Sequence, residues 1–188
     1  MSLASVFRLM VALPRIENPD VSEANLAVAP FLIRICTQVV IPMVEDFLHL
    51  SITTRNLERS IRFYETLGLK VLNDFGEVTE QGIAEAFCLP KSHLKVVYLG
   101  APQGRSGLFI DLVEWVDPNS PGEAYAVANH VGLNRFALRV TDLDSMVNSL
   151  KDAGIQFMND MPQVFGEGIR CIVAKDPDGV FVQLVEGL

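Results

Sequence analysis

Basic residues are scarce in this sequence. Its 15 lysines and arginines are outnumbered by 23 aspartates and glutamates, which gives a formal net charge of −8. A protein that binds nucleic acid needs a basic surface to release the counterions of the phosphate backbone. The charge balance therefore argues against a nucleic-acid-binding protein.

Cysteine is also rare. The three cysteines, Cys36, Cys88 and Cys171, lie far apart in apolar surroundings. An odd number of widely spaced cysteines is typical neither of a disulfide framework nor of a metal-binding motif. We predict buried thiols in a protein of the reducing cytoplasm.

An unbroken apolar run long enough to span a membrane is missing as well. The most apolar stretch, residues 24–44, is interrupted by two prolines and by Arg34. A membrane-spanning helix needs about 20 consecutive, predominantly apolar residues. We therefore predict no membrane-spanning helix and no membrane partner.

What the sequence does contain is one unit that occurs twice. Residues 49–72 have the pattern of a half-buried strand, a helix with an apolar stripe, a glycine and another strand. Residues 135–155 follow the same plan, and Leu57 to Gly68 matches Leu143 to Gly154 in length. These matches indicate an internal duplication.

Each copy closes with a similar strand, at residues 109–114 and 181–186, and residues 76–92 are predicted to be a loose connection within the first copy. The stretch DPNSPG at residues 117–122 has the composition of a linker. The predicted organisation is an N-terminal extension (1–45), a first module (46–117), a linker (118–130) and a second module (131–188), with 46–188 forming one domain.

These features resemble the vicinal-oxygen-chelate superfamily, which includes glyoxalase I, extradiol dioxygenases and bleomycin resistance proteins. The resemblance rests on the stretch NLERSIRFYETLGLKV and on the closing KDPDGVFVQLVE. It implies an α+β fold of tandem βαβββ modules, whose eight strands form a curled cup around a small-molecule ligand. By the same resemblance we expect a homodimer.

Alternation along the strands predicts which side chains enter the cup. The predicted lining comes from four strands: His49, Ser51, Thr53, Phe109, Asp111, Val113, Trp115, Arg135, Ala137, Arg139, Phe181, Gln183 and Val185. Apolar walls with a few polar groups are typical of a small-molecule pocket. Within this lining we predict that the substrate is bound by Arg135, Gln183, Ser51, Trp115, Arg139 and Phe181. The opposite strand faces are uniformly apolar and are predicted to pack beneath the helices.

In metal-dependent members of the superfamily, each module supplies one metal ligand from its first strand and one from its last. The matching positions here are His49, Asp111, Arg135 and Gln183. Arg135 cannot ligate, because its guanidinium stays protonated and has no acceptor atom. We therefore expect no metal, with Arg135 bonded to Asp111 and to Gln183. If a metal is bound, we expect nickel, zinc, iron or manganese on His49, Asp111 and Gln183.

Two functions of different class fit this site. One is a lyase or isomerase of the glyoxalase or epimerase type, acting on an oxygen-rich carbonyl or carboxylate metabolite. In that case His49 or Asp111 is the catalytic base and Arg135 stabilises the oxyanion. The other is a non-catalytic protein that sequesters a ligand, as bleomycin resistance proteins do. An extradiol dioxygenase ranks third, because its iron site resembles two histidines and a glutamate.

A structural role remains the alternative for several of these residues. In that case His49 is a hydrogen-bonded structural histidine, and Arg135 and Asp111 form a buried ion pair that has no catalytic role. Glu114 and Glu186, near the ends of the closing strands, are predicted to be solvated charges.

Overall fold

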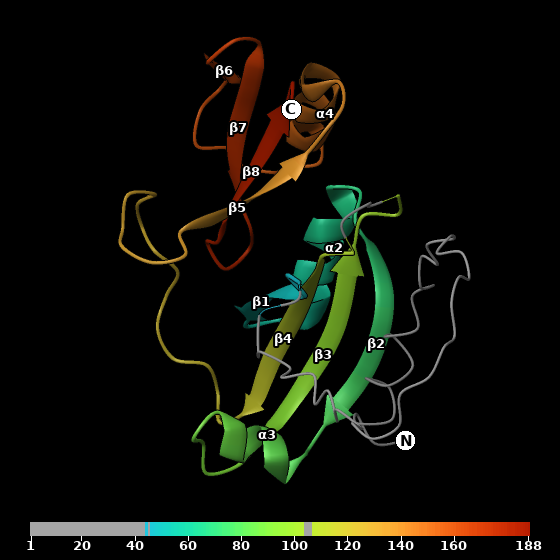
Figure 1. Ribbon diagram of the computed structural model, residues 1–188, viewed down its shortest axis with the longest axis vertical. Coiled ribbons are helices and arrows are strands. Elements are labelled where there is room, and N and C mark those ends of the chain that lie inside the picture. Colours follow the sequence, from blue (N-terminus) through green and yellow to red (C-terminus); the bar gives the residue numbers. More distant parts are fainter. Residues whose placement is uncertain (1–43, 45, 104–106) are drawn as a thin grey trace, which may run out of the picture. The chain divides into compact units, whose positions relative to one another are not determined.

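The first module is a four-stranded sheet with one long helix. Its elements are β1 (His49–Thr54), α2 (Leu57–Thr66), β2 (Lys70–Val78), α3 (Gln81–Ala86), β3 (His93–Gly100) and β4 (Phe109–Asp117). The strands lie in the order β1-β4-β3-β2. Strand β1 is parallel to β4, and the other pairs are antiparallel. Figure 1 shows this sheet with helix α2 behind it.

The second module repeats this topology. Its elements are β5 (Arg135–Arg139), α4 (Leu143–Asp152), β6 (Gln163–Phe165), β7 (Ile169–Lys175) and β8 (Phe181–Glu186). The order β5-β8-β7-β6 places the first strand parallel to the last, as in the first module. The tandem βαβββ prediction is confirmed, with the eight strands divided between two hydrogen-bonded sheets (Figure 1).

The computed structural model describes residues 44, 46–103 and 107–188. Most of the predicted N-terminal extension, including Cys36, lies outside the described residues. Residues 44–188 form one compact unit. Within the described part of the chain, no helix has the length and apolar character needed to cross a membrane.

Equivalent local signals begin and end the two long helices. Asn56 caps α2 by accepting a hydrogen bond from Arg59 N at 2.8 Å, and Asp142 caps α4 by accepting one from Ser145 N at 3.2 Å. After both helices the chain turns at a glycine with positive φ, +92° at Gly68. Glycine adopts this left-handed conformation without the steric cost that other residues meet.

The core lies between the helices and the sheet faces that they cover. It contains the fully buried Leu112 and Leu184 from the closing strands and Leu57 and Leu143 from the helices. The apolar strand faces predicted from alternation are therefore confirmed as core. Because side chains alternate, the polar residues of the same strands face the other way and are available for a site.

Each closing strand carries a glutamate that caps the N-terminus of the helix of its own module. Glu114 Oε2 accepts a hydrogen bond from Leu57 N at 2.6 Å, and Glu186 Oε1 accepts one from Leu143 N at 3.0 Å. The first N–H groups of a helix have no acceptor within the helix and attract negative charge. The prediction that these glutamates are solvated charges was wrong, because both are partly buried against a helix terminus.

Two further predictions are corrected by the structure. Residues 76–92 include the end of β2 and helix α3, whose six residues are too few to show a helical repeat in the sequence. Cys88 is exposed and Cys171 is partly exposed, so neither is the buried thiol that we predicted. Cys88 follows α3 at the surface, and Cys171 is the register partner of Val185, on the sheet face that carries Gln183 rather than on the core face.

Candidate functional site

The site of the first module is built around His49 and Asp111, on the neighbouring strands β1 and β4. The register pairs Asp111 with Ser51, so His49 lies diagonally across from the aspartate. His49 Nε2 is 3.8 Å from Asp111 Oδ2, and the two side chains are 32% and 18% exposed. This separation is too long for a direct hydrogen bond, although it allows a charge interaction when the imidazole is protonated.

Both residues also present a polar atom that has no partner. His49 Nδ1 and Asp111 Oδ1 are buried and make no hydrogen bond with any described residue. Buried polar atoms in native proteins are nearly always hydrogen-bonded, to protein or to another bound group. The pair therefore has bonding capacity that a ligand can use.

The surroundings of Asp111 change its acidity. Burial raises the pKa of Asp111, and the effect is partly offset by the nearby His49 charge and by a hydrogen bond from Ser51. A raised pKa makes a carboxylate a better proton acceptor near neutral pH. Ser51, predicted to bind substrate, thus lies beside the pair and acts on it.

An aromatic wall adjoins the pair, and only part of it was predicted. The ring of Tyr98 lies 4.3 Å from that of Phe109 and 4.7 Å from that of Phe75, measured between centroids, and the Phe109 ring lies 5.4 Å from His49. Tyr98 is the register partner of Asp111 on strand β3. Burial, and then the charge of Asp111, raise the pKa of Tyr98. The alternation of residues 94–99 could have indicated that Tyr98 belongs to the site. The register shifts in β2 break the alternation that would have indicated Phe75.

The second module contributes Arg135 and Gln183, from β5 and β8. Arg135 Nε donates to Gln183 Oε1 at 2.9 Å, and its Nη1 donates to Asn134 Oδ1 at 3.1 Å. The predicted contact between Arg135 and Gln183 is present. Among the described residues, however, Arg135 forms no ion pair with Asp111; the aspartate lies against His49 instead.

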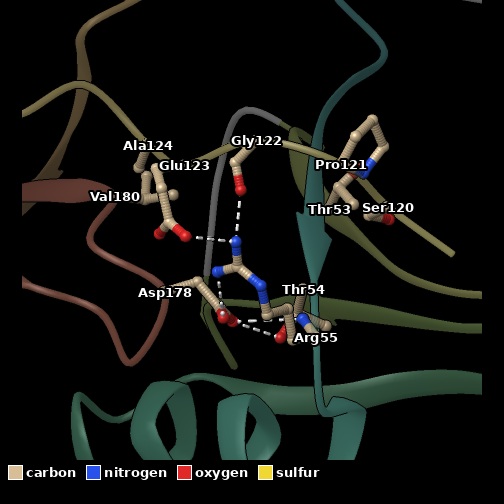
Figure 2. Close-up of a pocket in the computed structure, with 10 residues that line it drawn as sticks. All are labelled: Thr53, Thr54, Arg55, Ser120, Pro121, Gly122, Glu123, Ala124, Asp178 and Val180. Atoms are coloured by element: carbon tan, nitrogen blue, oxygen red, sulfur yellow. Dashed lines mark hydrogen bonds and ion pairs between the residues drawn. The ribbon is translucent and has the colours of Figure 1, made fainter.

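Two neighbouring cavities lie along strand β1. The smaller, of about 160 Å³, is lined by Ser51, Asn134 and Arg135 among others; His49, Asp111 and Gln183 are not among its lining residues. The larger, of about 250 Å³, is lined by residues 53–55, 120–124, 178 and 180, and is shown in Figure 2. Thr53 and Val180 line both cavities. No sequence pattern indicated that residues 120–124 would form a cavity wall.

The remaining predicted substrate-binding residues lie elsewhere on the sheets. Trp115 is partly exposed and its ring lies 6.0 Å from that of Phe87. Phe181 is buried, with Lys175 Nζ 5.3 Å from its ring centroid. Arg139 is exposed at the end of β5. None of these three lines either cavity, and their roles stay predictions.

Comparison with known proteins places this architecture in a family. Residues 46–184 match the family model of the Glyoxalase/Bleomycin resistance protein/Dioxygenase superfamily. The chain belongs to this superfamily, as the duplicated signatures predicted.

Individual relatives are more distant. The chain is 28% identical over 141 residues to a protein of Brassica oleracea var. gemmifera described as a putative lactoylglutathione lyase. The match covers 74% of this chain and 44% of the relative, so the chain spans less than half of that protein's length.

Solved structures support the fold. A glyoxalase family protein from Bacillus cereus superposes with a TM-score of 0.71 and 21% identity, covering 79% of this chain and 98% of that one. The trypanothione-dependent glyoxalase I of Leishmania major gives a TM-score of 0.54 and 22% identity, covering 76% and 87% of the two chains.

Members of the superfamily commonly use divalent metals. Of the four expected ligand positions, His49 and Asp111 lie together, and the described residues include no group of three or more His, Cys, Asp or Glu side chains placed to hold an ion. Gln183 directs its amide oxygen to Arg135, whose positive charge disfavours a cation beside it. The donor set therefore does not fit a tightly held metal.

Proposed function

We propose that this protein is a lyase or isomerase that moves a proton on a carbon atom next to a carbonyl or carboxylate group of an oxygen-rich metabolite. The observation that carries the proposal is the pair of His49 and Asp111, 3.8 Å apart, each with a buried polar atom that lacks a partner among the described residues. Such a pair can accept and return a proton when a substrate lies against it.

Asp111 is the proposed base. It takes the proton, while the electron pair of the carbon–hydrogen bond moves into the carbonyl group and forms an enediolate. Return of the proton to a neighbouring carbon gives the isomerised product. His49, in its protonated form, stabilises the charge of this intermediate from its place beside Asp111. The raised pKa of Asp111 supports this assignment of roles.

Arg135 is the proposed anion-binding residue. Its guanidinium lines the cavity that also contains Ser51, the register partner of Asp111. A guanidinium binds a carboxylate through two parallel hydrogen bonds, which fixes the orientation of the substrate as well as its position. Gln183 holds the Arg135 side chain through its 2.9 Å hydrogen bond.

Hydrogen–deuterium exchange tests the proposal without knowledge of the natural substrate. Purified protein in D₂O is incubated with 2-hydroxy- and 2-oxocarboxylates, and loss of the proton signal next to the carbonyl is followed by NMR. We expect exchange with the wild-type protein and a loss of about 100-fold or more in Asp111→Asn. His93→Gln is the matched control, because His93 pairs with Glu77 at 2.9 Å, outside this site. Equal exchange in Asp111→Asn and wild type would refute the assignment.

A ligand-sequestering protein, like the bleomycin resistance proteins, is the alternative function. The wall of Phe75, Tyr98 and Phe109, whose rings meet edge-on and tilted, favours it, because an aromatic surface binds a planar ligand without any chemistry. The same compounds then raise the melting temperature, since they bind only the folded state, but their protons do not exchange.

Superfamily proteins bind small molecules and often form dimers. For this chain we propose a homodimer and retain the cytoplasmic location as a prediction. The module limits, 46–117 and 131–188 with the linker 118–130, are likewise retained as a proposal.

A further inference from the structure

The larger cavity beside β1 has no part in the chemistry proposed above. It is bounded by the end of β1, by the linker and by the turn before β8. Arg55 lies in the middle of its lining residues, and Figure 2 shows the guanidinium between the linker residues Gly122 and Glu123 and the turn residue Asp178. The contacts of this arginine decide what the cavity can bind.

Arg55 contacts the linker at a backbone carbonyl and at one exposed carboxylate. Its Nη2 donates to Gly122 O and to Glu123 Oε1, the latter at 2.9 Å. The Arg55 side chain is 45% exposed and that of Glu123 is 80% exposed. Exposed ion pairs contribute little to stability, because water and salt screen them. Another carboxylate can therefore replace Glu123 at small cost to the fold.

Asp178 does not neutralise Arg55 by itself, because it is already engaged. Its Oδ1 accepts a hydrogen bond from Arg59 Nη2 at 2.7 Å, and its Oδ2 accepts one from Thr54 Oγ1 at 2.5 Å. Arg55 Nη1 lies farther away, at 3.6 Å. Asp178 is thus shared between Arg59 and Arg55, whereas Glu123 pairs with Arg55 alone. When Glu123 turns away, the remaining partner carboxylate of Arg55 is the shared Asp178, so the two arginines together carry one more positive charge than their partners.

A second, independent observation points to a ligand. Ser120 Oγ lies among the residues that line the cavity, and it is buried without a hydrogen-bond partner among the described residues. A buried hydroxyl in that state favours a bound group that supplies the missing bond. A carboxylate oxygen can accept that hydrogen bond, as it can from a guanidinium. Figure 2 draws Ser120 on the other side of β1 from the Arg55 guanidinium, so the two groups would meet different parts of a ligand.

We infer that the cavity lined by the linker binds a carboxylate group of a small molecule, which displaces Glu123 from Arg55. In the absence of the ligand, the carboxylate of Glu123 pairs with Arg55 in place of the ligand carboxylate. The neighbouring cavity, which contains Arg135, shares Thr53 and Val180 with this one. The ligand class is therefore a dicarboxylate with one carboxylate on Arg55 and the other on Arg135. The contact with Arg135 rests on the proposed function; the contact with Arg55 does not.

Isothermal titration with straight-chain dicarboxylates from succinate to suberate, and with hexanoate as the monocarboxylate, tests this inference. We expect the best dicarboxylate to bind about tenfold more weakly to Arg55→Gln, since a charged hydrogen-bonding partner is lost. We expect it to bind more tightly, by about threefold or more, to Glu123→Gln, because the competing carboxylate is gone. The matched control is Arg62→Gln, which removes another exposed arginine of the same region, paired with Glu58.

The two substitutions separate a ligand site from a structural contact. If the pair of Arg55 and Glu123 only fastens the linker, Glu123→Gln lowers the melting temperature and leaves dicarboxylate affinity unchanged, which overturns the inference. It is also overturned if no dicarboxylate binds better than hexanoate. A third outcome separates the two arginines. If hexanoate binding is lost in Arg135→Gln and unchanged in Arg55→Gln, Arg135 binds an anion as the proposed function requires, and the inferred carboxylate site at Arg55 is refuted.

Discussion

The Tyr64 hydroxyl donates a hydrogen bond of 2.9 Å to Asp176 Oδ2, and so joins the helix of the first module to the last hairpin of the second. Both residues are buried. Asp176 Oδ1 also accepts hydrogen bonds from the backbone N–H groups of Asp178 and Val180, at 2.9 and 2.8 Å. The turn between β7 and β8 is therefore an attachment point between the modules.

Tyr64→Phe removes this hydrogen bond and keeps the ring. Because a buried acceptor loses one of its partners, we expect the free energy of unfolding to fall by about 1–3 kcal/mol. Urea denaturation at neutral pH measures the change. Tyr98→Phe is the control, since the Tyr98 hydroxyl forms no hydrogen bond to a described residue; we expect its cost to stay below about 1 kcal/mol. Equal losses in the two variants would show that the bond to Asp176 adds nothing.

Asp178 makes the stability of this attachment depend on pH. Burial acts to raise the pKa of Asp178, but hydrogen bonds from Thr54 and Arg59 outweigh it and lower the pKa below the usual aspartate value. Since the folded pKa is the lower one, the stabilisation is present above the unfolded pKa of about 4 and is lost as the pH falls through the folded pKa.

We therefore expect the stability difference between wild type and Asp178→Asn to be largest near pH 7 and to shrink below about pH 4. Urea denaturation at pH 7 and pH 3 gives the two differences. Asp160→Asn, at an exposed position, corrects for the general effect of acid. A difference that is the same at both values of pH would exclude Asp178 as the titrating group.

Asp111→Asn is expected to separate activity from stability. Burial raises the pKa of Asp111, so the charged form is disfavoured in the folded protein. Stability from this group is present below the unfolded pKa and is lost as the pH rises through the folded pKa. At pH 7 the neutral asparagine avoids that loss, and we expect a melting temperature equal to wild type or about 2–4 °C higher. Differential scanning calorimetry measures it; a clear decrease would assign Asp111 a structural role.

The parts of the fold that repeat were predictable from the sequence. The two helices and their glycine ends appear twice at the same spacing, and each copy closes with a similar strand. Alternation along those strands then placed Leu112 and Leu184 in the core. Helix α3 was missed because a six-residue helix containing a glycine has no recognisable period. The capping by Glu114 and Glu186 was missed because it depends on where the closing strand lies relative to a helix N-terminus, which alternation does not encode.

The site was predictable only within each module. Alternation and the family pattern indicated His49 and Asp111, which the structure places 3.8 Å apart on neighbouring strands, and also Arg135 with Gln183. They did not indicate how residues of different modules meet, so the predicted bond between Arg135 and Asp111 is absent from the described residues. The contacts of Arg55 with the linker depend on a segment without periodicity, and only the three-dimensional structure shows them.

Strand β1 carries site residues on one face and core residues on the other, paired with β4 in a single register. A slip of one residue along β4 would turn Leu50 and Ile52 outward and bury His49 and Ser51 beneath the helix. The positions of the reacting groups are therefore protected by the same energy that keeps apolar side chains out of water. In random mutagenesis of β1, we therefore expect substitutions of the core-facing residues to be tolerated as poorly as substitutions of the site residues.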